Sequence, residues 1–461
     1  MTQRALILGL GRFGGGRAAA AFLAARGTSL RIVDRAAAET LATSVESLQT
    51  EFGANAFDWR LGAESQSSSD NLLDGIDTCV VNPAVRPDHP LLAAARVRGV
   101  TITQEANLFL EAYPGRTVFV TGTNGKSTTA TLLSRCLTRA GHDVLLGGNI
   151  GRSLLETEST WTPEQVAILE ISSAQLSRID PLRHRVHGAI ATRITMDHVD
   201  WHGSLGAYHS AKTRALAAAD DFVVHAADDV VAETGCAPTA STRIRFRAAP
   251  PQPGEVGVRD GWIESSLTAD AGRVLHGSAS HLVGRFHNEN LAAAFAAAHA
   301  LGLDRAEAGL ALSRVRPLRH RLQLLAEREG VRVYGNAVST EVRSTVSALE
   351  SIEGRIHWIG GGKSKTDDFE GFARQIEPLV ASASLFGAAA TDLATAIQPS
   401  VPTTTHENLE AALDAAWQQA ARGDALLFSP GFASFDQFVN FRARAAVFER
   451  WVRGLLRRPG S

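Results

Sequence analysis

The stretch Gly122-Thr-Asn-Gly-Lys-Ser-Thr-Thr129 decides how this chain is organised. It follows a β-branched and aromatic run at 117–120 and precedes a helical pattern at 130–140. A glycine loop between a strand and a helix can surround phosphates with backbone N–H groups, while its lysine and serine reach phosphate and Mg²⁺. The loop departs from a full Walker motif, because Val120 stands where that motif has its first glycine. It still predicts an ATP site, made of Gly122, Thr123, Asn124, Gly125, Lys126, Ser127 and Thr128.

The composition restricts the class of protein around this loop. The chain has 461 residues, of which 44% are hydrophobic and 20% charged, and its formal net charge is -2. These values exclude a disordered or fibrous chain, and the charge gives no reason to expect a nucleic-acid partner. Three scattered cysteines form neither a metal motif nor a disulfide framework, which favours the cytoplasm. No apolar stretch reaches the ~18 residues of a membrane span, so we expect none.

Short apolar runs alternate with helical stretches on both sides of the loop, which predicts an α/β protein of three domains. We place a Rossmann-like domain at 1–114, a central domain with a parallel sheet like that of P-loop ATPases at 115–315, and a Rossmann-like C-terminal domain at 316–461. Residues 237–277 are rich in Pro, Gly and Thr, and we expect loops and small antiparallel strands there. The third domain has predicted strands at 331–334, 356–359, 383–386 and 425–428.

A second glycine motif, Gly9-Leu-Gly11-Arg-Phe-Gly14, follows the first apolar run. Such glycines allow a tight turn and a close approach of the backbone to phosphate at a helix N-terminus. Asp34, at the end of the next predicted strand, could bind a ribose or the edge of a base. The motif alone is weak, and a plain tight turn between strand and helix is the alternative.

Three polar side chains beyond the phosphate loop are candidates for a metal site. Glu170 ends an apolar run at 166–169, where a carboxylate is costly unless it binds something. His198 follows another apolar run, and Lys212 lies on a predicted helix. Taken singly, the histidine and the lysine are more often structural. Their places beyond the carboxyl ends of parallel strands favour one site shared with the phosphate loop.

Five motifs stand in the order found in one known family. They are the phosphate loop, Glu170-Ile-Ser-Ser-Ala-Gln175, Asp197-His-Val-Asp200, His320-Arg321 and Ser429-Pro-Gly-Phe-Ala-Ser-Phe-Asp-Gln-Phe438. In this order they resemble the Mur ligases, ATP-dependent amide-bond ligases of peptidoglycan synthesis, over nearly the whole chain. The last motif is similar to the branch that adds D-glutamate to UDP-N-acetylmuramoyl-L-alanine. Folylpolyglutamate synthases share the phosphate loop, but they lack the first domain.

The resemblance implies a mechanism and a role for each matching residue. ATP phosphorylates the substrate carboxylate, and the amine of the amino acid attacks the acyl phosphate. Family members carbamylate the lysine that matches Lys212, which makes it an anionic metal ligand. The implied catalytic residues are Lys126, His198, Lys212 and Arg321; further ATP contacts are Asn288 (or His287, depending on register), Arg321 and Asn336; ligands for two Mg²⁺ ions are Ser127, Glu170, His198 and Lys212. The implied contacts of UDP-MurNAc-L-alanine are Arg12, Phe13, Asp34, Arg35, Asn82, Asn149, Ser172 and Gln175, and those of glutamate are Thr340, Lys365, Ser434 and Phe441.

The chain also departs from the family pattern. Asn336 and Val338 stand where the family has an aspartate and a lysine, while Thr340 matches. The loss of a cation weakens a site for a dianionic amino acid, although Lys363 adds one near Lys365. Arg193 replaces a usual asparagine.

We therefore predict a cytoplasmic, monomeric ATP-dependent ligase that joins D-glutamate to UDP-MurNAc-L-alanine. The altered segment at 336–341 keeps three alternatives open. The amino acid could be L-glutamate, or it could be another amino acid. The chain could also be a nucleotide-binding paralogue that has lost ligation.

Overall fold

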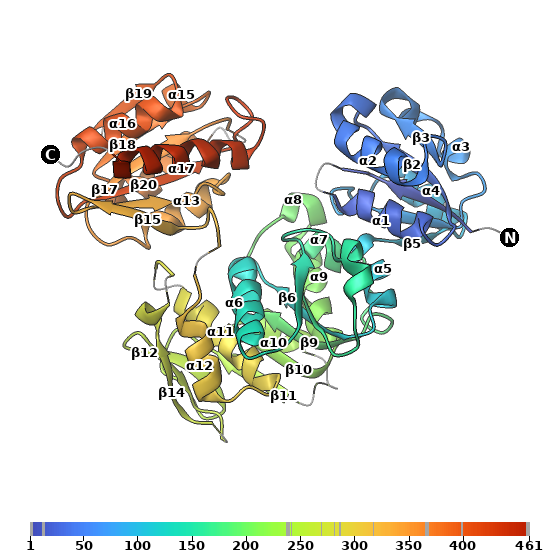
Figure 1. Cartoon of the computed structure of the whole chain (residues 1–461), viewed down its shortest axis with the longest axis horizontal. Helices are drawn as coiled ribbons and strands as arrows, with labels where there is room; N and C mark the ends of the chain where they lie inside the picture. Colours follow the sequence, from blue (N-terminus) through green and yellow to red (C-terminus); the bar gives the residue numbers. More distant parts are fainter. Residues whose placement is uncertain are drawn as a thin grey trace. The chain divides into compact units, whose positions relative to one another are not determined.

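The computed structural model describes residues 3–11, 14–236, 240, 242–268, 270–280, 282–284, 287–316, 318–364, 368–397 and 400–457. The fold is α/β, with three sheets made mostly of parallel strands, as predicted (Figure 1). The chain divides into two compact units: Met1–Leu275 with Glu289–Leu312, and His276–Asn288 with Ser313–Ser461. Among the described helices, none has the length and apolar character needed to span a membrane. The domain boundaries near 114 and 315 stay predictions.

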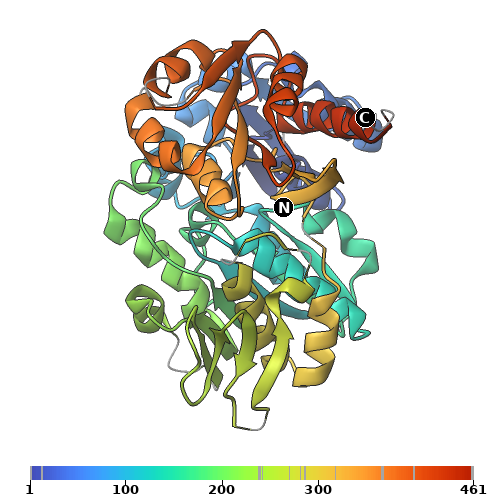
Figure 2. The same ribbon diagram turned by 90° about the vertical axis from the view of Figure 1, so that its left-hand side faces the viewer.

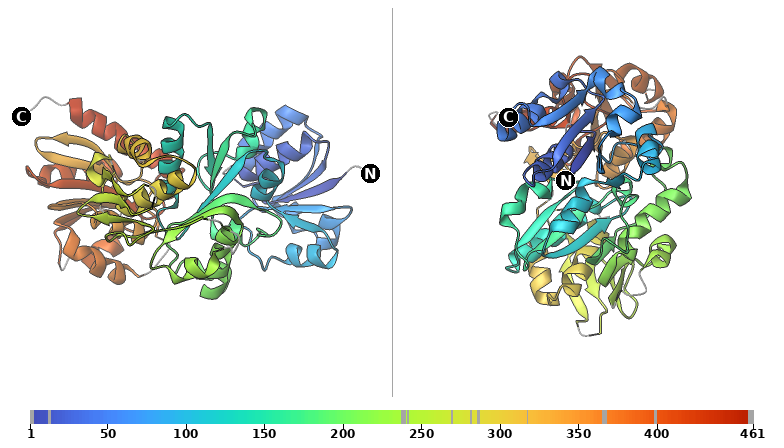
Figure 3. Two further views of the ribbon diagram at one scale, coloured as in Figure 1. Left: turned by 90° about the horizontal axis from the view of Figure 1, so that it is seen from below. Right: turned by 90° about the vertical axis from the view of Figure 1, so that its right-hand side faces the viewer.

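The first sheet has the order β3-β2-β1-β4-β5 and is parallel throughout. Apolar side chains on both faces of β1 are buried, because helices cover both faces. Helices α1, α2 and α5 pack on one face and α3 and α4 on the other (Figure 3). The strands are β1 (Arg4–Leu8), β2 (Ser29–Asp34), β3 (Phe57–Leu61), β4 (Thr78–Val81) and β5 (Thr101–Thr103). The helices are α1 (Gly15–Ala24), α2 (Ala42–Phe52), α3 (Ser69–Leu73), α4 (Pro90–Val97) and α5 (Glu105–Ala112), with 3-10 turns at Ala38–Leu41 and Gly62–Gln66.

The central sheet has the order β14-β13-β12-β11-β10-β9-β6-β8-β7. Strand β6 lies between β8 on one side and β9 on the other. The chain passes from β6 to β7 on the β8 side of the sheet, and it later returns to β9 and β10 on the opposite side of β6. Such a switch point opens a crevice at the carboxyl ends of the strands, where α/β proteins bind ligands. The strands are β6 (Arg116–Thr121), β7 (Val144–Gly148), β8 (Val166–Glu170), β9 (Val186–Ala191), β10 (Ala219–Ala226), β11 (Thr242–Phe246), β12 (Glu255–Arg259), β13 (Trp262–Ser265) and β14 (Gly272–His276). The helices are α6 (Lys126–Arg139), α7 (Ser173–Leu176), α8 (Val199–His202), α9 (Leu205–Ala217), α10 (Val230–Gly235), α11 (His287–Ala300) and α12 (Arg305–Ser313), with 3-10 turns η3 (Leu154–Thr160) and η4 (Gly277–Ala279).

The region 237–277 differs in part from the expectation of small antiparallel strands. Strands β11 and β12 extend the central sheet in parallel, and the antiparallel pairing begins between β12 and β13. Buried Ile244 and Phe246 hold β11 against the sheet, but the two alternate with polar residues in a short run. Such a run does not tell parallel from antiparallel pairing.

The third sheet, in the second unit, has the order β15-β16-β20-β17-β18-β19. Only the β15–β16 pairing at its edge is antiparallel among the described pairs. Helices α13, α14 and α15 cover one face, and α16 and α17 cover the other (Figure 2). The strands are β15 (Gln323–Arg328), β16 (Val331–Gly335), β17 (Ile356–Gly361), β18 (Ser382–Phe386), β19 (Thr403–His406) and β20 (Ala425–Gly431). The helices are α13 (Val342–Leu349), α14 (Phe369–Ile376), α15 (Ala390–Ile397), α16 (Leu409–Gln419) and α17 (Phe441–Arg457), with a 3-10 turn at Glu377–Leu379.

Within the first unit, the first and central sheets are joined by specific contacts. The rings of Phe109, Tyr113 and Trp161 form a cluster with centroids 4.7–5.5 Å apart. The Gln104 side chain donates to the carbonyl of Gln175 at 2.7 Å. These contacts bring α5 of the first domain against the loops of the central domain.

Candidate active site

The phosphate loop continues from β6 into α6 as the sequence predicts. Gly122 and Gly125 have φ values of 132° and 81°, which side chains other than glycine rarely adopt. A Cβ at Gly122 would lie 2.0 Å from Thr192 Oγ1, and one at Gly125 would lie 2.4 Å from Asn290 Oδ1. Both glycines are therefore required by the backbone and by close neighbours. The loop ends at the N-terminus of α6, which favours anions.

Residues 192–195, which follow β9, run beside the phosphate loop; we name them the bracing segment. The Thr192 N–H donates to the Thr121 carbonyl at 3.0 Å, and the Thr192 hydroxyl donates to the Asn124 carbonyl. The Thr123 N–H donates to the Arg193 carbonyl at 2.6 Å. The Thr195 N–H donates to Thr123 Oγ1 at 2.9 Å. These hydrogen bonds fix the end of β6 and the first half of the loop, at residues 121–124.

Lys126 and Ser127 lie in the first turn of α6. The Lys126 ammonium donates to the carbonyl of Thr123 at 2.7 Å, so its side chain folds back over the loop. Ser127 is buried. A flexible cation above the loop and a hydroxyl at the helix start are the groups that phosphate and Mg²⁺ use in such loops.

Lys212 is 2% exposed and lies beneath the same loop. Its Nζ donates to Thr121 Oγ1 at 3.1 Å and to the Gly122 carbonyl at 2.8 Å. Burial, and then the nearby Lys126 charge, hold the pKa of Lys212 well below its ordinary 10.5, against the opposing attraction of Asp197 and Glu170. This is no solvated helix lysine, which was the simpler reading of the sequence. A lowered pKa makes the neutral, nucleophilic form of the amine easier to reach than in an ordinary lysine.

Tyr208 is a residue of this site that the sequence reasoning missed. It is fully buried one turn before Lys212 on α9, and its hydroxyl lies 2.8 Å from Thr123 Oγ1. The Lys212 Nζ lies 5.6 Å from the centre of its ring. The spacing of four residues on a helix was the available signal, because it places both side chains on one face.

Glu170 ends β8, as predicted, and is 2% exposed. Its Oε1 accepts from the Asn149 side chain at 3.3 Å. Its Oε2 is buried without a hydrogen-bond partner among the described residues. A buried carboxylate oxygen in that state calls for a bound cation or water.

His198 is largely exposed. It caps α8 with a φ of 46°, its side chain is 60% exposed, and its Nε2 is 3.6 Å from Asp197 Oδ2. Within the described residues, no three His, Cys, Asp or Glu side chains are grouped as a metal site. The structure thus brings Lys212 to the phosphate loop, whereas the joint metal site of Glu170, His198 and Lys212 stays a prediction.

Several predicted substrate residues meet at the carboxyl end of the first sheet. Asp34 accepts from the Gly11 N–H at 3.0 Å and from the Ala36 N–H at 2.9 Å. A Cβ at Gly9 would lie 2.8 Å from Asn82 Cβ, so Asn82 packs against the same turn. Arg35 is exposed beside it. Arg12 and Phe13 lie outside the described residues.

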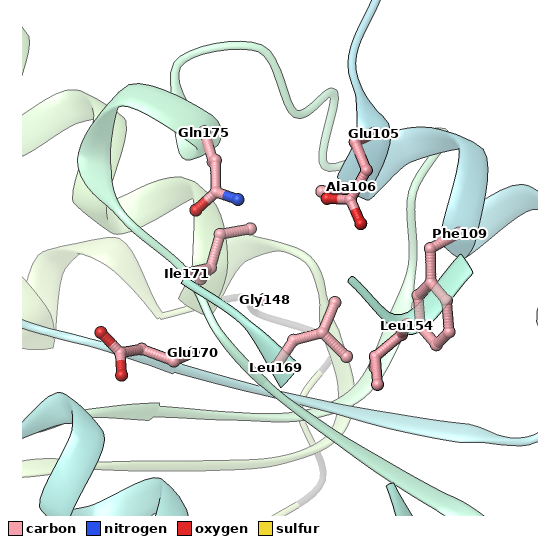
Figure 4. A pocket seen from close by; sticks show the side chains of 9 residues that line it. All are labelled: Glu105, Ala106, Phe109, Gly148, Leu154, Leu169, Glu170, Ile171 and Gln175. Carbon is pink, nitrogen blue, oxygen red and sulfur yellow. The ribbon is translucent and has the colours of Figure 1, made fainter. Parts of the chain in front are cut away.

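A narrow pocket lies in the first unit where α5 meets the central sheet (Figure 4). The Glu105 carboxylate and the Gln175 amide face the same space, above Leu154 and Leu169, while the Glu170 carboxylate points away from it (Figure 4). Burial raises the pKa of Glu105, and a hydrogen bond from Ser153 opposes that effect. Ser172 and Gln175 form a capping box at the start of α7. Ser172 and Gln175 are predicted substrate residues, and the capping box holds them at the edge of this pocket.

The described residues among those predicted for the third domain follow β16 or β20, or begin α17. Asn336 is buried; its Oδ1 accepts from the Leu322 N–H at 3.3 Å and its amide donates to Ser429 Oγ at 3.0 Å. The bond to Ser429 joins the end of β16 to β20, and the bond from Leu322 holds the segment before β15, so the Asn336 side chain already has a structural task. Thr340 and Phe441 are half-buried, Ser434 is buried, and Lys365 lies outside the described residues.

The predicted pair His320-Arg321 at the start of this domain also lies in the second unit. His320 has a φ of 68°, and its Nδ1 is 3.4 Å from Glu449 Oε1. Its ring meets the Phe441 ring edge-on at 6.5 Å. Arg321 is exposed.

The start of α11 carries a second residue that the sequence reasoning missed. Asn290 is buried against the phosphate loop, where its Oδ1 accepts from the Thr129 hydroxyl at 3.3 Å. Asn288, the predicted ATP contact, instead lies against Gly277: a Cβ there would be 2.1 Å from Asn288 Oδ1. His287, the alternative, precedes Asn290 by three residues and so lies on the same helical face.

Comparisons with known proteins agree with this arrangement. Residues 120–298 match the Mur ligase middle domain, and residues 320–432 match the Mur ligase glutamate ligase domain. UDP-N-acetylmuramoylalanine--D-glutamate ligase of Acidobacterium capsulatum is 33% identical over 98% of this chain and 96% of its own length. The protein of the same name from Nitrosococcus oceani is 32% identical over 99% and 98%. The chain belongs to the Mur ligase family.

Solved structures support the fold of this Mur ligase. UDP-N-acetylmuramate-alanine ligase from Thermotoga maritima has a TM-score of 0.60 at 17% identity, covering 99% of this chain and all of that chain. The MurF ligase of the same organism, solved in complex with ADP, has a TM-score of 0.56 at 15% identity, covering 84% and 91%. At these identities the likeness concerns the fold alone.

The lysines of this Mur ligase are confined to a few places. The sequence contains four, at positions 126, 212, 363 and 365. Lys126 and Lys212 lie above and beneath the phosphate loop, and Lys363 is exposed, with its backbone bridged to Ala433. Arginine serves the other basic positions.

Proposed function

We propose that this Mur ligase uses ATP to join D-glutamate to UDP-N-acetylmuramoyl-L-alanine, a step of peptidoglycan precursor synthesis. The name of relatives that match over nearly their full length supports the choice of substrates. The observation that carries the proposal is the phosphate loop at the switch point of the central sheet, with Lys126 above it and Lys212 buried beneath it.

The proposed reaction has two steps. A carboxylate oxygen of the L-alanine end attacks the γ-phosphorus of ATP, which gives an acyl phosphate and ADP. The amine of glutamate then attacks the acyl carbon, loses a proton and expels phosphate. Backbone N–H groups at the start of α6 and the Lys126 ammonium hold the phosphates and neutralise the charge on the transferred group.

The donor set fits a magnesium ion. The Ser127 hydroxyl is placed at the helix start, and the unpartnered Glu170 Oε2 is a hard oxygen ligand. We propose that these two, with His198, hold Mg²⁺ at up to two positions. When bound, Mg²⁺ draws charge from the phosphate oxygens.

Lys212 fits carbamylation. Its lowered pKa means that the amine loses its proton at a lower pH than an ordinary lysine does. The neutral amine can add to CO₂ to form an N-carboxylate with loss of one proton. The modification would replace an amine by an anion beside Glu170 and the loop, which favours a bound cation. Lys212→Ala should then lose activity, and an added short-chain carboxylic acid should restore part of it. Clear electron density for an unmodified ammonium at Lys212 in an active, magnesium-loaded crystal would contradict the carbamate.

The first domain is the proposed site of the UDP end. Asp34 and Asn82 order the turn at Gly9–Gly11, beside which Arg35, and in the undescribed part Arg12 and Phe13, are proposed to contact the nucleotide. Asn149, Ser172 and Gln175 are proposed for the MurNAc-L-alanine end, since they lie where the first and central domains meet.

Glutamate is proposed to bind Thr340, Lys365, Ser434 and Phe441 in the third domain, with Arg321 reaching the ATP phosphates. Asn288 or His287, and Asn336, are the proposed ATP contacts outside the loop. Val338 supplies no charge, so Lys365 and Lys363 would carry the pairing with carboxylates.

A phosphate-release assay with UDP-MurNAc-L-alanine, ATP and Mg²⁺ tests the proposal against a panel of amino acids. D-glutamate should give the highest kcat/KM, and formation of the dipeptide product should match phosphate release. A preference for L-glutamate or another amino acid would correct the substrate. Phosphate release with no amino acid, or with none of the panel, would refute the ligase.

We also propose that the enzyme is a cytoplasmic monomer. ATP and a UDP-linked substrate are cytoplasmic, and the three cysteines are free thiols, which suits a reducing compartment. Sedimentation at several protein concentrations should show one species of 49.0 kDa. A larger species would refute the monomer.

A further inference from the structure

Arg193 takes no part in the chemistry proposed above, yet it belongs to the segment that braces the phosphate loop. Its carbonyl accepts the Thr123 N–H at 2.6 Å, and its neighbours Thr192 and Thr195 bond to the loop on either side. The position of the Arg193 backbone therefore sets the position of the loop.

The Arg193 guanidinium joins this segment to two other elements. Its Nη1 lies 3.0 Å from Asp228 Oδ2, beyond β10, and its Nη2 lies 3.0 Å from Glu289 Oε1, in the first turn of α11. Asp229 supports the same segment, because its Oδ2 accepts the Ile194 N–H at 2.7 Å. The segment is thus held from the β10 side and from α11.

Helix α11 also contacts the phosphate loop, at Gly125. Asn290, next to Glu289, touches Gly125 and accepts from the Thr129 hydroxyl of α6. The bracing segment and α11 therefore both support the loop, and the pair of Arg193 with Glu289 links these two supports directly.

The two ion pairs are unequal. The Asp228 side chain is 66% exposed, so water and salt screen its pair strongly, whereas the Glu289 side chain is 24% exposed. On the ground of this difference in exposure we take Glu289 as the stronger of the two partners of the guanidinium.

We propose that Arg193 is a positioning residue of the nucleotide site: by tying the bracing segment to α11 through Glu289, it holds the phosphate loop in the conformation that binds ATP. This inference rests on the proposed use of ATP. Pre-ordered N–H groups bind phosphate without first losing backbone freedom, so a looser loop binds nucleotide more weakly. The effect belongs to ATP binding, since Arg193 touches neither the UDP end nor the amino-acid end.

The test compares Arg193→Ala with Arg185→Ala. Arg185 precedes β9, pairs with Asp220 and donates to the carbonyls of Pro181, Ala217 and Ala219, so the control removes an ion pair and backbone contacts at the other end of the same strand. Arg193→Ala should raise the KM for ATP about three- to fivefold, the size of one partly exposed ion pair, with the KM for UDP-MurNAc-L-alanine unchanged. Hydrogen exchange at residues 122–125 should accelerate by a similar factor. Arg185→Ala should change neither.

Three further variants keep the test decisive if Arg193→Ala folds poorly. Glu289→Gln keeps the side-chain shape and should reproduce the rise in the KM for ATP, whereas Asp228→Asn should have a smaller effect. The exchange Arg193→Glu with Glu289→Arg should recover part of the loss. The inference is overturned if Glu289→Gln leaves the KM for ATP and loop exchange at wild-type values, or if Asp228→Asn has the larger effect. A wild-type enzyme that binds no ATP would instead refute the proposed function.

Discussion

Removal of one hydroxyl, in Tyr208→Phe, should loosen the phosphate loop without unfolding the protein. The Tyr208 hydroxyl lies 2.8 Å from Thr123 Oγ1. Thr123 Oγ1 keeps two other partners, the Thr195 N–H at 2.9 Å and the Thr195 carbonyl at 3.3 Å. The variant therefore loses one net hydrogen bond, about 1 kcal/mol, and the phenyl ring still fills the core.

Thr123→Val should do more damage, although it also removes a single hydroxyl. It leaves the Thr195 N–H without its acceptor and takes away the partner of Tyr208 at the same time. A donor left unsatisfied adds about 1–3 kcal/mol, so the total is about 2–4 kcal/mol. The comparison of the two variants thus separates the free energy of one lost hydrogen bond from the larger cost of leaving the Thr195 N–H without an acceptor.

Hydrogen exchange read by mass spectrometry at residues 122–125 and 192–195 measures both effects. A loss of about 1 kcal/mol in local opening corresponds to about fivefold faster exchange for Tyr208→Phe, and Thr123→Val should exceed tenfold. Equal exchange in the wild type and Tyr208→Phe, or equal exchange in the two variants, would refute this account of the network.

Three other expectations follow from the site. Lys126→Ala should abolish phosphate release and leave the melting temperature unchanged, because the side chain folds over the loop rather than into the core. Near-normal turnover of the variant would refute the catalytic role of Lys126. Asp34→Ala should raise the KM for UDP-MurNAc-L-alanine several-fold and leave that for ATP unchanged, since the carboxylate holds the Gly11 turn; a change in both would point to general damage. Burial raises the pKa of Glu105 above 4.5, so the folded protein keeps this proton to a higher pH than the unfolded chain does. The resulting contribution to the free energy of unfolding is present below pH 4.5 and is lost as the pH rises through the pKa of the folded state. Urea denaturation across that range should show this slope in the wild type and not in Glu105→Gln.

The phosphate loop could be predicted because its signals are local. A β-branched strand, two glycines with positive φ and a helix start stand in one short stretch, and the structure keeps that order. Asn290 could not be found in this way, because it meets Thr129 across 161 positions of sequence. Nothing near Asn290 in the chain indicates which loop its helix will touch.

The burial of Lys212 was equally hidden from composition. A lysine on an alanine-rich helix is usually solvated, and only the resemblance to a family gave it a role; the packing of α9 on the central sheet decides that it is buried. Edge strands were missed for a different reason. β15 has only one buried residue, and β19 reads Thr-Thr-Thr-His, so neither shows an apolar run.

The scarcity of lysine makes this chain well suited to experiments that label lysine side chains selectively. Apart from the chain's amino terminus, the primary amines are the four at 126, 212, 363 and 365, two of them at the phosphate loop and two in the segment that follows β17. A lysine-selective isotope would therefore give a spectrum of four side-chain signals, two of them from the phosphate loop and two from the segment that follows β17. An amine-reactive inhibitor would also have few competing amines to react with, because the sequence contains only these four lysines.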